Sequence, residues 1–411
     1  MSTTPDPRRV LVVGAGLAAV QTVAALREQG FDGSLTVIGA EGVEPYDRPP
    51  LSKHLLDRAA PAWLSDEVGV HVTALADEVA LDDPALALTV DPSGVHVATE
   101  RRTLRADAVV VATGAHAVRP TGWDALTLHT AADAELLRGL LAPGTRLVVV
   151  GAGWIGAEVA GVAAAAGVDV TVLEAADAPL AGPLGARVGA LTAGWYDEAG
   201  VRLLTGARAT SVRADGVTLV DGHHVPADVV LAAVGARPTT GWLGEALVRE
   251  PDGSLRTDEA FAVLDVPGVP GARHVRAVGD VALRRSARHG WVPGGHWDGA
   301  LRGPAVLAAD LLRPGEADPA DPAPYVFSTQ LGHDLTLFGR PGPADDVVLR
   351  GDPRAGEGWA ALWYRPGTDT VAAVLTVDRP RDVGAARRLF TAAGLPTLPR
   401  TTAADASRPL R

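Results

Sequence analysis

The stretch Arg8 to Ala19, RRVLVVGAGLAA, decides the fold. Arg8 to Val13 is a short β-branched run, which indicates a buried strand, and a helical pattern of apolar residues follows it. Between the two, Gly14, Gly16 and Ala19 have the G-x-G-x-x-G/A spacing. This order predicts a cradle for the pyrophosphate of a dinucleotide, because backbone amides at a helix N-terminus attract negative charge.

A carboxylate follows where this pattern needs one. Ser34 to Ile38 is expected to form the next strand, and Glu41 comes directly after it. An acid about twenty residues after the glycines accepts hydrogen bonds from the ribose hydroxyls of the dinucleotide. Strand, helix, second strand and acid together predict a dinucleotide site, which we assign to FAD.

The same unit occurs a second time. Thr145 to Val150, TRLVVV, leads into the sequence GAGWIG, and Glu174 ends a further strand at Val168 to Leu173. The glycines of this copy are Gly151, Gly153 and Gly156. NADH is preferred over NADPH here, because a 2′-phosphate would meet the charge of Glu174 and no arginine follows immediately.

The similarity continues beyond the glycines. Ala106 to Ala115 reads ADAVVVATGA and Ala227 to Ala236 reads ADVVLAAVGA, so the repeat has the size of a domain. Two dinucleotide sites in one chain predict hydride transfer from a reduced nicotinamide to a flavin. Asp280, which closes the string AVGD after a predicted strand, is expected to hold the ribityl chain or the pyrophosphate.

Composition narrows the chemistry further. The chain has 411 residues, enough for two or three domains, and no cysteine. The missing cysteine excludes a catalytic thiol, a redox disulfide, a cysteine-bound iron–sulfur cluster and a zinc–cysteine site. Redox chemistry must therefore come from a bound cofactor. His289, His296 and His333 lack metal-like spacing with carboxylates, so we expect no metal.

Charge and hydropathy argue against large polyanionic partners. The formal net charge is −12, which opposes binding of nucleic acid, and no long apolar run indicates a membrane span. Together with the polar N-terminal sequence, this predicts a cytoplasmic protein. The net charge still permits a local basic patch, such as Arg284, Arg285 and Arg288, and the alternative for these residues is a solvated loop. Lys53 is the only lysine in the chain.

The segments outside the duplicated units predict antiparallel sheets and a separate tail. Alternating residues at Leu86 to Val97 and Val201 to Val220 predict meanders, and Pro314 to Pro324 has the composition of a linker. The tail is expected to be an α+β domain. Its strands are predicted in Tyr325 to Phe338, Gly358 to Tyr364 and Thr370 to Val377, and its helix in Arg381 to Ala393.

From Arg8 to Phe338 the sequence resembles the FAD-dependent ferredoxin reductase family, which includes putidaredoxin reductase, rubredoxin reductase and the reductases of aromatic-ring dioxygenases. The most specific string is PYDRPPLSK, from Pro45 to Lys53. The other matching strings are ATGA (112–115), GAGWIGAEVA (151–160), VGARP (234–238), AVGD (277–280) and HW (296–297).

The resemblance implies an α/β protein of the glutathione-reductase type, with two Rossmann-like dinucleotide-binding domains and a C-terminal α+β domain. The expected boundaries are 1–118 with 241–322 for the FAD-binding domain, 119–240 for the NAD-binding domain, and 323–411 for the C-terminal domain. It also implies that a [2Fe–2S] ferredoxin accepts electrons from FAD and supplies a cytochrome P450 or an oxygenase. We expect a monomer or a homodimer.

The resemblance further assigns residues. Lys53 is implied to lie beside the reactive nitrogen of the flavin, Glu158 near the nicotinamide, and Arg48 against FAD. An ammonium there would stabilise the reduced, anionic flavin, and a carboxylate would pair with it. The complete expected FAD set is Gly14, Gly16, Ala19, Glu41, Arg48, Lys53, Val79, Thr113, Gly114, Asp280 and Trp297. The expected NAD set is Gly151, Gly153, Ile155, Gly156, Glu158, Glu174 and Gly235.

This chain departs from the family pattern at positions expected around the flavin. It has His116 after ATGA in place of arginine, Gly295 before HW in place of glutamate, and FSTQ at Phe327 to Gln330 in place of Trp-Ser-Asp-Gln. Two alternatives therefore stay open. One is an NADH oxidase or diaphorase that reduces quinones or oxygen, and the other is an NADH-binding flavoprotein resembling apoptosis-inducing factor, without a ferredoxin partner.

Overall fold

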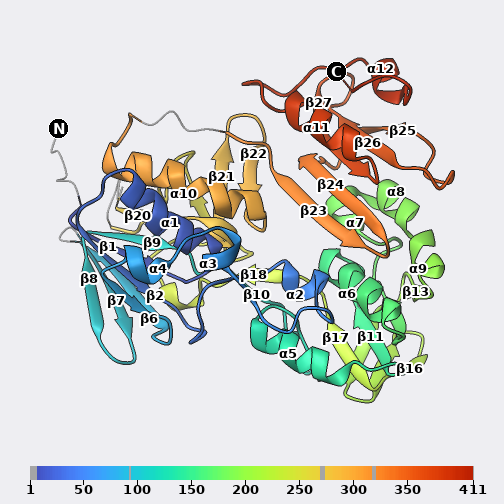
Figure 1. Cartoon of the computed structure of the whole chain (residues 1–411), viewed down its shortest axis with the longest axis horizontal. Coiled ribbons are helices and arrows are strands. Elements are labelled where there is room, and N and C mark those ends of the chain that lie inside the picture. The colour runs from blue at the N-terminus through green and yellow to red at the C-terminus, as the bar shows by residue number, and fades with distance from the viewer. Residues whose placement is uncertain (1–6, 92–93, 269–273, 317–320, 411) are drawn as a thin grey trace. The chain divides into compact units, whose positions relative to one another are not determined.

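The computed structural model describes residues 7–91, 94–268, 274–316 and 321–410. These residues form two compact units, each assembled from three separate segments of the chain (Figure 1). The first unit contains residues 1–47, 62–116 and 237–324, and the second contains residues 48–61, 117–236 and 325–411. The predicted division into FAD, NAD and C-terminal domains stays a prediction.

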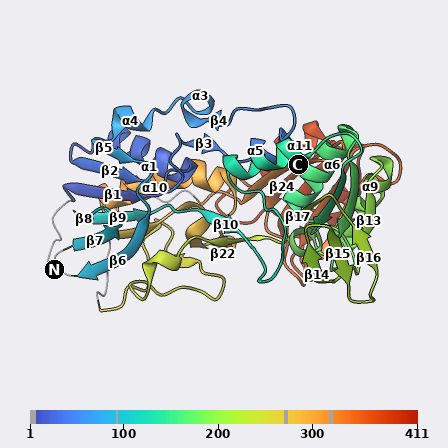
Figure 2. The same ribbon diagram turned by 90° about the horizontal axis from the view of Figure 1, so that it is seen from below.

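The first unit is built on a parallel five-stranded sheet of order β20-β9-β1-β2-β5. Its strands are β1 (Arg9–Val13), β2 (Ser34–Ile38), β5 (Glu78–Ala80), β9 (Ala108–Val111) and β20 (Val275–Ala277). The apolar runs that predicted β1 and β9 are buried, because helices cover a parallel sheet. Helix α1 (Leu17–Glu28) packs alongside α10 (Trp297–Leu312), as Figure 2 also shows.

The second unit repeats this arrangement. Its parallel sheet has the order β13-β12-β11-β17, and the strands are β11 (Arg146–Val150), β12 (Asp169–Leu173), β13 (Arg202–Leu204) and β17 (Val229–Ala232). Helix α6 (Trp154–Ala165) has the same length, 12 residues, as α1. The order β9-β1-β2-β5 thus corresponds strand by strand to β17-β11-β12-β13, which confirms the internal repeat.

One ion pair is duplicated with the sheets. Arg9 at the start of β1 pairs with Asp107, just before β9, at 2.6 Å. Arg146 at the start of β11 pairs with Asp228, just before β17, also at 2.6 Å. In both copies the aspartate also accepts the backbone N–H of its arginine at 2.9 Å. The repeated Ala-Asp of the sequence therefore fixes the first strand of each unit, β1 or β11, against its neighbour in the sheet, β9 or β17.

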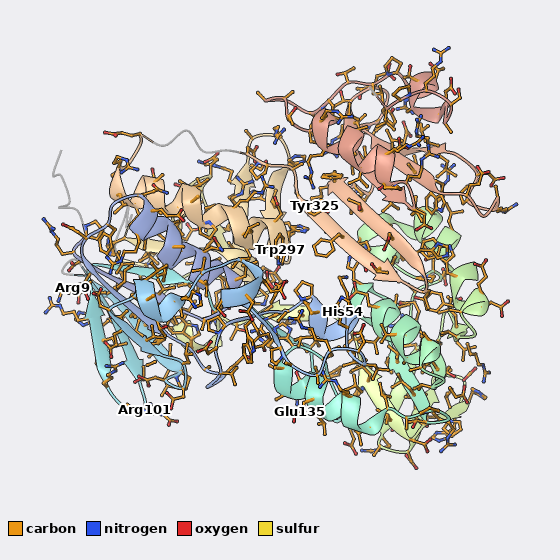
Figure 3. All side chains as sticks on the ribbon, viewed as in Figure 1. Arg9, His54, Arg101, Glu135, Trp297 and Tyr325 are labelled. Atoms are coloured by element: carbon orange, nitrogen blue, oxygen red, sulfur yellow. The ribbon has the colours of Figure 1, made fainter. Side chains whose placement is uncertain are left out.

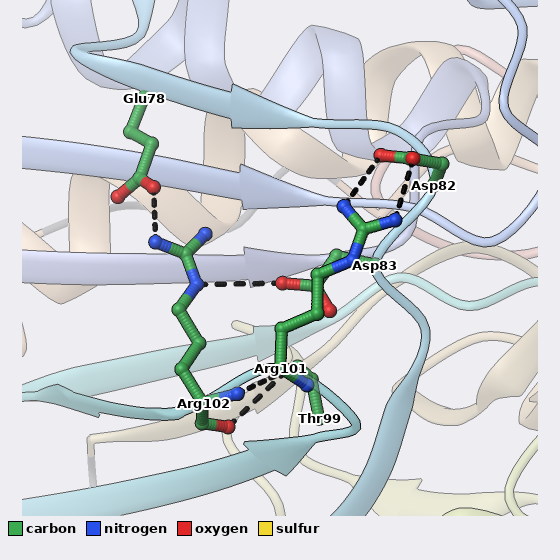
Figure 4. Close-up of polar contacts among 6 residues, drawn as sticks. All are labelled: Glu78, Asp82, Asp83, Thr99, Arg101 and Arg102. Atoms are coloured by element: carbon green, nitrogen blue, oxygen red, sulfur yellow. Dashed lines mark hydrogen bonds and ion pairs between the residues drawn. The ribbon is translucent and has the colours of Figure 1, made fainter.

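Both predicted stretches contribute to three-stranded antiparallel sheets, but residues 202–204 of the predicted range 201–220 form β13 of the parallel sheet instead. The antiparallel sheets consist of β6 (Ala85–Asp91), β7 (Gly94–Thr99) and β8 (Thr103–Ala106) in the first unit, and β14 (Ala209–Arg213), β15 (Gly216–Leu219) and β16 (His224–Pro226) in the second. Figure 4 shows how arginines hold the turn after β7. Arg101 binds both oxygens of Asp82, and Arg102 pairs with Glu78 and Asp83.

The tail is the α+β structure that the sequence predicts. Its antiparallel sheet has the order β23-β24-β27-β26-β25. The strands are β23 (Tyr325–Gln330), β24 (His333–Gly339), β25 (Asp346–Arg350), β26 (Trp359–Tyr364) and β27 (Val371–Val377), and the helices are α11 (Pro380–Leu389) and α12 (Arg400–Ala404). The predicted run 325–338 is two strands, because Leu331 has a φ of 51° and turns the chain. The helix ends at Leu389, earlier than expected.

Short elements complete the units. In the first unit they are β3 (Tyr46–Asp47), β4 (Ala62–Trp63), α3 (Leu64–Glu67), α4 (Val72–Leu75), η2 (Gly241–Leu243), β19 (Leu255–Thr257), η3 (Gly279–Val281), β21 (Ala282–Ser286) and β22 (Gly290–Pro293). In the second they are α2 (Pro50–Lys53), α5 (Ala131–Leu140), α7 (Ala181–Leu184), α8 (Ala186–Gly189), η1 (Ala190–Thr192) and α9 (Gly194–Glu198). The chain passes between the units within β10 (Ala115–Ala117) and β18 (Ala236–Pro238).

Candidate functional site

The first glycine motif forms an open turn at the start of α1. Gly14 has a φ of +118°, and a side chain there would meet the carbonyl oxygen of Ala112 at 2.2 Å. The N–H of Gly14 is used within the fold, since it donates to Ile38 at 2.8 Å. Gly16 precedes the helix, and a Cβ there would meet no atom within 4 Å. The first N–H groups of a helix have no partner within the helix, and the open space at Gly16 leaves room beside them for a pyrophosphate.

The second motif has the same geometry. Gly151 has a φ of +109°, and a side chain there would meet Ala233 O at 2.4 Å. A Cβ on Gly156 would lie 2.0 Å from Gly151 O, so that glycine is needed for close packing of helix on strand. Gly153 stands at the start of α6. A Cβ on Gly153 would again meet no atom of the described residues within 4 Å, its chain neighbours aside. In each copy the fold fills the space at the first glycine and leaves it open at the second.

Each acid lies after the second strand of its unit. Glu41 follows β2, and one of its oxygens accepts the Tyr46 hydroxyl at 2.5 Å. Glu174 follows β12, and its two oxygens accept backbone N–H groups of Ala152 and Ala176, both at 2.8 Å. Ala152 lies inside the second glycine turn, so Glu174 is fixed beside the cradle. Each carboxylate oxygen can accept more than one hydrogen bond, which leaves capacity for ribose hydroxyls.

The remaining residues predicted for FAD in the first unit are distributed over a strand, a helix and loops. Val79 is in β5, and buried Ala19 is in α1. Thr113 donates its hydroxyl to Thr239 O at 2.7 Å, and Gly114 O accepts the N–H of Thr239 at 2.9 Å.

Two further predicted FAD residues have structural partners in the first unit. Asp280 accepts the N–H of Gly295 at 3.0 Å. Trp297, the first residue of α10 in Figure 3, donates its indole N–H to Asp47 at 2.8 Å. The indole of Trp297 is thus fixed by a side-chain partner in addition to its packing.

Lys53 and Glu158 lie together in the second unit. Lys53 ends α2, Glu158 is in α6, and their side chains form an ion pair. Glu158 is 4% exposed, and it also accepts the hydroxyls of Ser52, at 2.5 Å, and Ser328. Three donors aimed at one buried carboxylate match its ionised form, because a carboxylate accepts hydrogen bonds and does not donate them. The ammonium of Lys53 also lies 5.3 Å from the ring centre of Phe327.

The described hydrogen bonds of the other predicted residues in the second unit do not involve Lys53 or Glu158. Arg48 donates to His129 O at 2.7 Å. Ile155 is exposed, and Gly235 has a φ of +109° while its carbonyl accepts the N–H of Val118 at 2.9 Å. The assignment of all these residues to FAD or NAD stays a prediction.

Sequence reasoning missed Ser52, Ser328, Gln330 and Tyr46 as members of these sites. Ser52 and Tyr46 both lie inside the quoted string PYDRPPLSK. Ser328 and Gln330 alternate along β23, and this period of two was the available signal that they share a face.

The three arginines of the possible basic patch are paired within the fold. Arg284 pairs with Asp321 at 2.8 Å, and Arg288 lies 3.7 Å from the same carboxylate. Arg285 pairs with Glu259 at 2.8 Å. Two acids distant in sequence therefore offset most of the positive charge of these three arginines. Asp321 belongs to the predicted linker, of which residues 317–320 lie outside the described residues.

None of the helices in the described ranges is long and apolar enough to cross a bilayer. Within the same ranges, no three histidine or acidic side chains gather in a way that could hold a metal ion.

Comparisons with known proteins bear on the family. A family model described as pyridine nucleotide-disulphide oxidoreductase matches residues 8–299, and one described as reductase C-terminal matches residues 325–411. The chain is 33% identical, over 399 residues, to the benzene 1,2-dioxygenase system ferredoxin–NAD(+) reductase subunit of Pseudomonas putida. That alignment covers 93% of this chain and 92% of the relative.

Two solved structures have the same fold over nearly the whole chain. One is the covalent putidaredoxin reductase–putidaredoxin complex, with a TM-score of 0.87, 28% identity and coverage of 99% and 98% of the two chains. The other is the ferredoxin reductase for the CYP199A2 system from Rhodopseudomonas palustris, with a TM-score of 0.85, 29% identity and coverage of 98% of both chains.

These findings confirm the predicted fold class, with its two dinucleotide-binding folds and C-terminal α+β domain. They also confirm an NAD(P)H-dependent FAD oxidoreductase. Both cradles fit their cofactors, since each combines an open helix end with an acid after the second strand. The chain belongs to the pyridine nucleotide-disulphide oxidoreductase family and carries the reductase C-terminal domain.

Proposed function

We propose that this protein is an NADH-dependent FAD flavoprotein that reduces a [2Fe–2S] ferredoxin, which in turn serves a cytochrome P450 or an oxygenase. The observation that carries the proposal is the duplicated cradle. Gly16 and Gly153 each leave the N-terminus of a helix open, and Glu41 and Glu174 each follow the second strand. One cradle would hold FAD and the other NADH. A ferredoxin as the electron acceptor is supported by relatives that are named as ferredoxin–NAD(+) reductase components of dioxygenase systems.

Bound FAD would supply the conversion from a two-electron donor to a one-electron acceptor, which no side chain of this cysteine-free protein provides. The protein would contribute binding and orientation. The end of α1 would neutralise the pyrophosphate, while Glu41 would hold the adenosine ribose.

Lys53 and Glu158 would act nearest the reacting atoms. Lys53 would place a positive charge where negative charge develops during reduction. Glu158 would keep that ammonium in one position, because the two side chains form an ion pair. The negative charge of Glu158 would also orient the amide of the nicotinamide. A cytoplasmic location belongs to this proposal, since NADH is supplied in that compartment.

The first experiment is an anaerobic visible spectrum of the purified protein before and after one equivalent of NADH. We expect the bands of oxidised flavin, and their bleaching by NADH. A colourless protein that could not be reconstituted with FAD would contradict the proposal that this protein is a flavoprotein.

The acceptor needs a separate experiment. Cytochrome c reduction by NADH should rise strongly when a purified [2Fe–2S] ferredoxin such as putidaredoxin is added. Equal rates with and without ferredoxin would point to a diaphorase or oxidase. A long-lived complex with NADH and no turnover would point to a flavoprotein resembling apoptosis-inducing factor.

A further inference from the structure

The carboxylate of Glu158 is held by more than its lysine. Its Oε1 accepts hydrogen bonds from the Lys53 ammonium and the Ser328 hydroxyl, and its Oε2 accepts the Ser52 hydroxyl at 2.5 Å. Both oxygens are therefore occupied, and rotation of the carboxylate would break at least one contact. Ser328 comes from β23, 170 positions beyond Glu158 in the chain.

Gln330 fixes the direction of the Ser328 hydroxyl. Its side-chain N–H donates to Ser328 Oγ at 2.9 Å. Since Ser328 then accepts from Gln330, its single proton is free to point at Glu158. Ser328 and Gln330 are 3% and 2% exposed, so both side chains lie away from bulk solvent.

Burial alternates along β23. Ser328 and Gln330 are buried, whereas Phe327 and Thr329 are exposed, and of these two Phe327 has its ring centre 5.3 Å from the Lys53 ammonium. Thr329 uses its hydroxyl differently, by donating to Asp334 at 2.8 Å. The departures from the family string Trp-Ser-Asp-Gln fall on the exposed positions, Phe327 and Thr329. Both buried positions keep the residue that the string has.

We propose that Ser328 and Gln330 are positioning residues for the Lys53–Glu158 pair, so that the C-terminal domain completes this site. The physical reason is the burial of Glu158, because a buried carboxylate keeps one orientation only when its lone pairs are satisfied. A chain of donors from Gln330 through Ser328 to Glu158 satisfies them. Only the role of the Lys53–Glu158 pair in flavin reduction rests on the proposed function.

Lys53 makes a direct test possible, because it is the only lysine in the chain. Trace labelling of the FAD-loaded protein with acetic anhydride therefore reports on Lys53 and on the α-amine of the chain, which serves as an internal reference. Acetic anhydride acylates the neutral amine and not the ammonium, so a lysine whose proton is held by a fixed carboxylate is labelled slowly, and one released from the carboxylate is labelled faster. The measured quantity is the ratio of labelling at Lys53 to labelling at the α-amine, determined by mass spectrometry at fixed pH.

Five variants are compared with the wild type. Ser328→Ala and Gln330→Met remove the two donors, and Ser328→Thr keeps the hydroxyl. Glu158→Gln removes the charge that holds Lys53 and sets the upper limit. Thr329→Val removes a hydroxyl from an exposed position of the same strand and is the matched control.

We expect Ser328→Ala to raise the labelling ratio about fivefold, as for the loss of one hydrogen bond to a charged group, and Gln330→Met to raise it less. Thr329→Val and Ser328→Thr should stay near the wild-type ratio. A ratio for both Ser328→Ala and Gln330→Met that equals that of Thr329→Val would overturn the proposal. If Ser328→Ala did not fold, Gln330→Met alone would decide, because its side chain has a similar volume.

Stopped-flow reduction of the same variants by NADH tests the consequence for the reaction. We expect Ser328→Ala to slow flavin reduction while the dissociation constant of NADH stays unchanged. Slower reduction without a change in labelling would also count against a positioning role. A failure of ferredoxin to accept electrons would leave both readouts intact, so it would concern only the proposed function.

Discussion

Lys53 pairs with Glu158, 105 residues further along the chain, and Glu158 lies almost completely out of contact with water. The pair joins the end of the short helix α2 to the first turns of α6. An ion pair in such a place gains little stability, because both charges lose their hydration. Its presence is better explained by the chemistry that the proposed function assigns to it.

Replacement of Lys53 by alanine tests this assignment. We expect Lys53→Ala to retain FAD and to slow its reduction by NADH about a hundredfold, the scale found when one preorganised charge or donor is removed. Stopped-flow bleaching of the flavin is the measurement. His54→Ala is the control, since His54 is the next residue and pairs only with exposed Asp57 in the contacts described. Unchanged bleaching in Lys53→Ala would remove Lys53 from the reaction.

Alanine substitutions at the cradle glycines distinguish an effect on protein stability from an effect on cofactor binding. Gly156→Ala should lower the free energy of unfolding by about 1 to 3 kcal/mol, because its methyl group would lie 2.0 Å from Gly151 O. Gly153→Ala meets no atom within 4 Å, so it should fold normally and weaken NADH binding. Gly16→Ala should likewise fold and weaken FAD binding. Thermal melts and titrations of the two cofactors measure these effects, and normal cofactor affinity in Gly16→Ala and Gly153→Ala would refute the two cradles.

The choice between NADH and NADPH is assigned to Glu174. Glu174→Ala should shift the ratio of kcat/KM for NADH over NADPH by about tenfold toward NADPH, because the like charge facing a 2′-phosphate is removed. Asp177→Ala, a charge removal on an exposed neighbour, should leave the ratio unchanged. An equal shift in both variants would mean that general charge, and not the ribose site, sets the preference.

The ion pair between Arg146 and Asp228 makes the stability of the folded protein depend on pH. Hydrogen bonds from Arg146 lower the pKa of Asp228 to about 2. A carboxylate with a lowered pKa stabilises the folded state above its unfolded pKa, near about 4, and this contribution disappears as the pH falls through the folded pKa. Asp228→Asn should therefore be less stable than the wild type above about pH 4, and the difference should close toward pH 2.

Thermal melting between pH 7 and pH 2 measures this difference. It should be small, since both side chains are 46% exposed and screened by water. Asp215→Asn, at an exposed position of the same unit, controls for the loss of one charge. A difference that grew as the pH fell would show that the sign is wrong.

The sequence by itself determined the two nucleotide-binding units. Strand, glycine turn, helix and acid are consecutive, so their geometry follows from local backbone rules and the strand-forming runs. For the same reason the matching sheet orders and the repeated pairs Arg9–Asp107 and Arg146–Asp228 follow the repeat in the sequence. The lack of cysteine likewise fixed the reliance on a bound cofactor.

Tertiary structure alone decided which distant side chains meet. Nothing in the sequence near Glu158 indicates that Ser328 and Gln330 would hold it, because their contact depends on how β23 lies against α6. The same holds for Asp321, which pairs with Arg284 although it lies 37 positions further along the chain. A pattern along the chain encodes the face on which a side chain lies, whereas only the packing of whole elements determines what stands opposite that face.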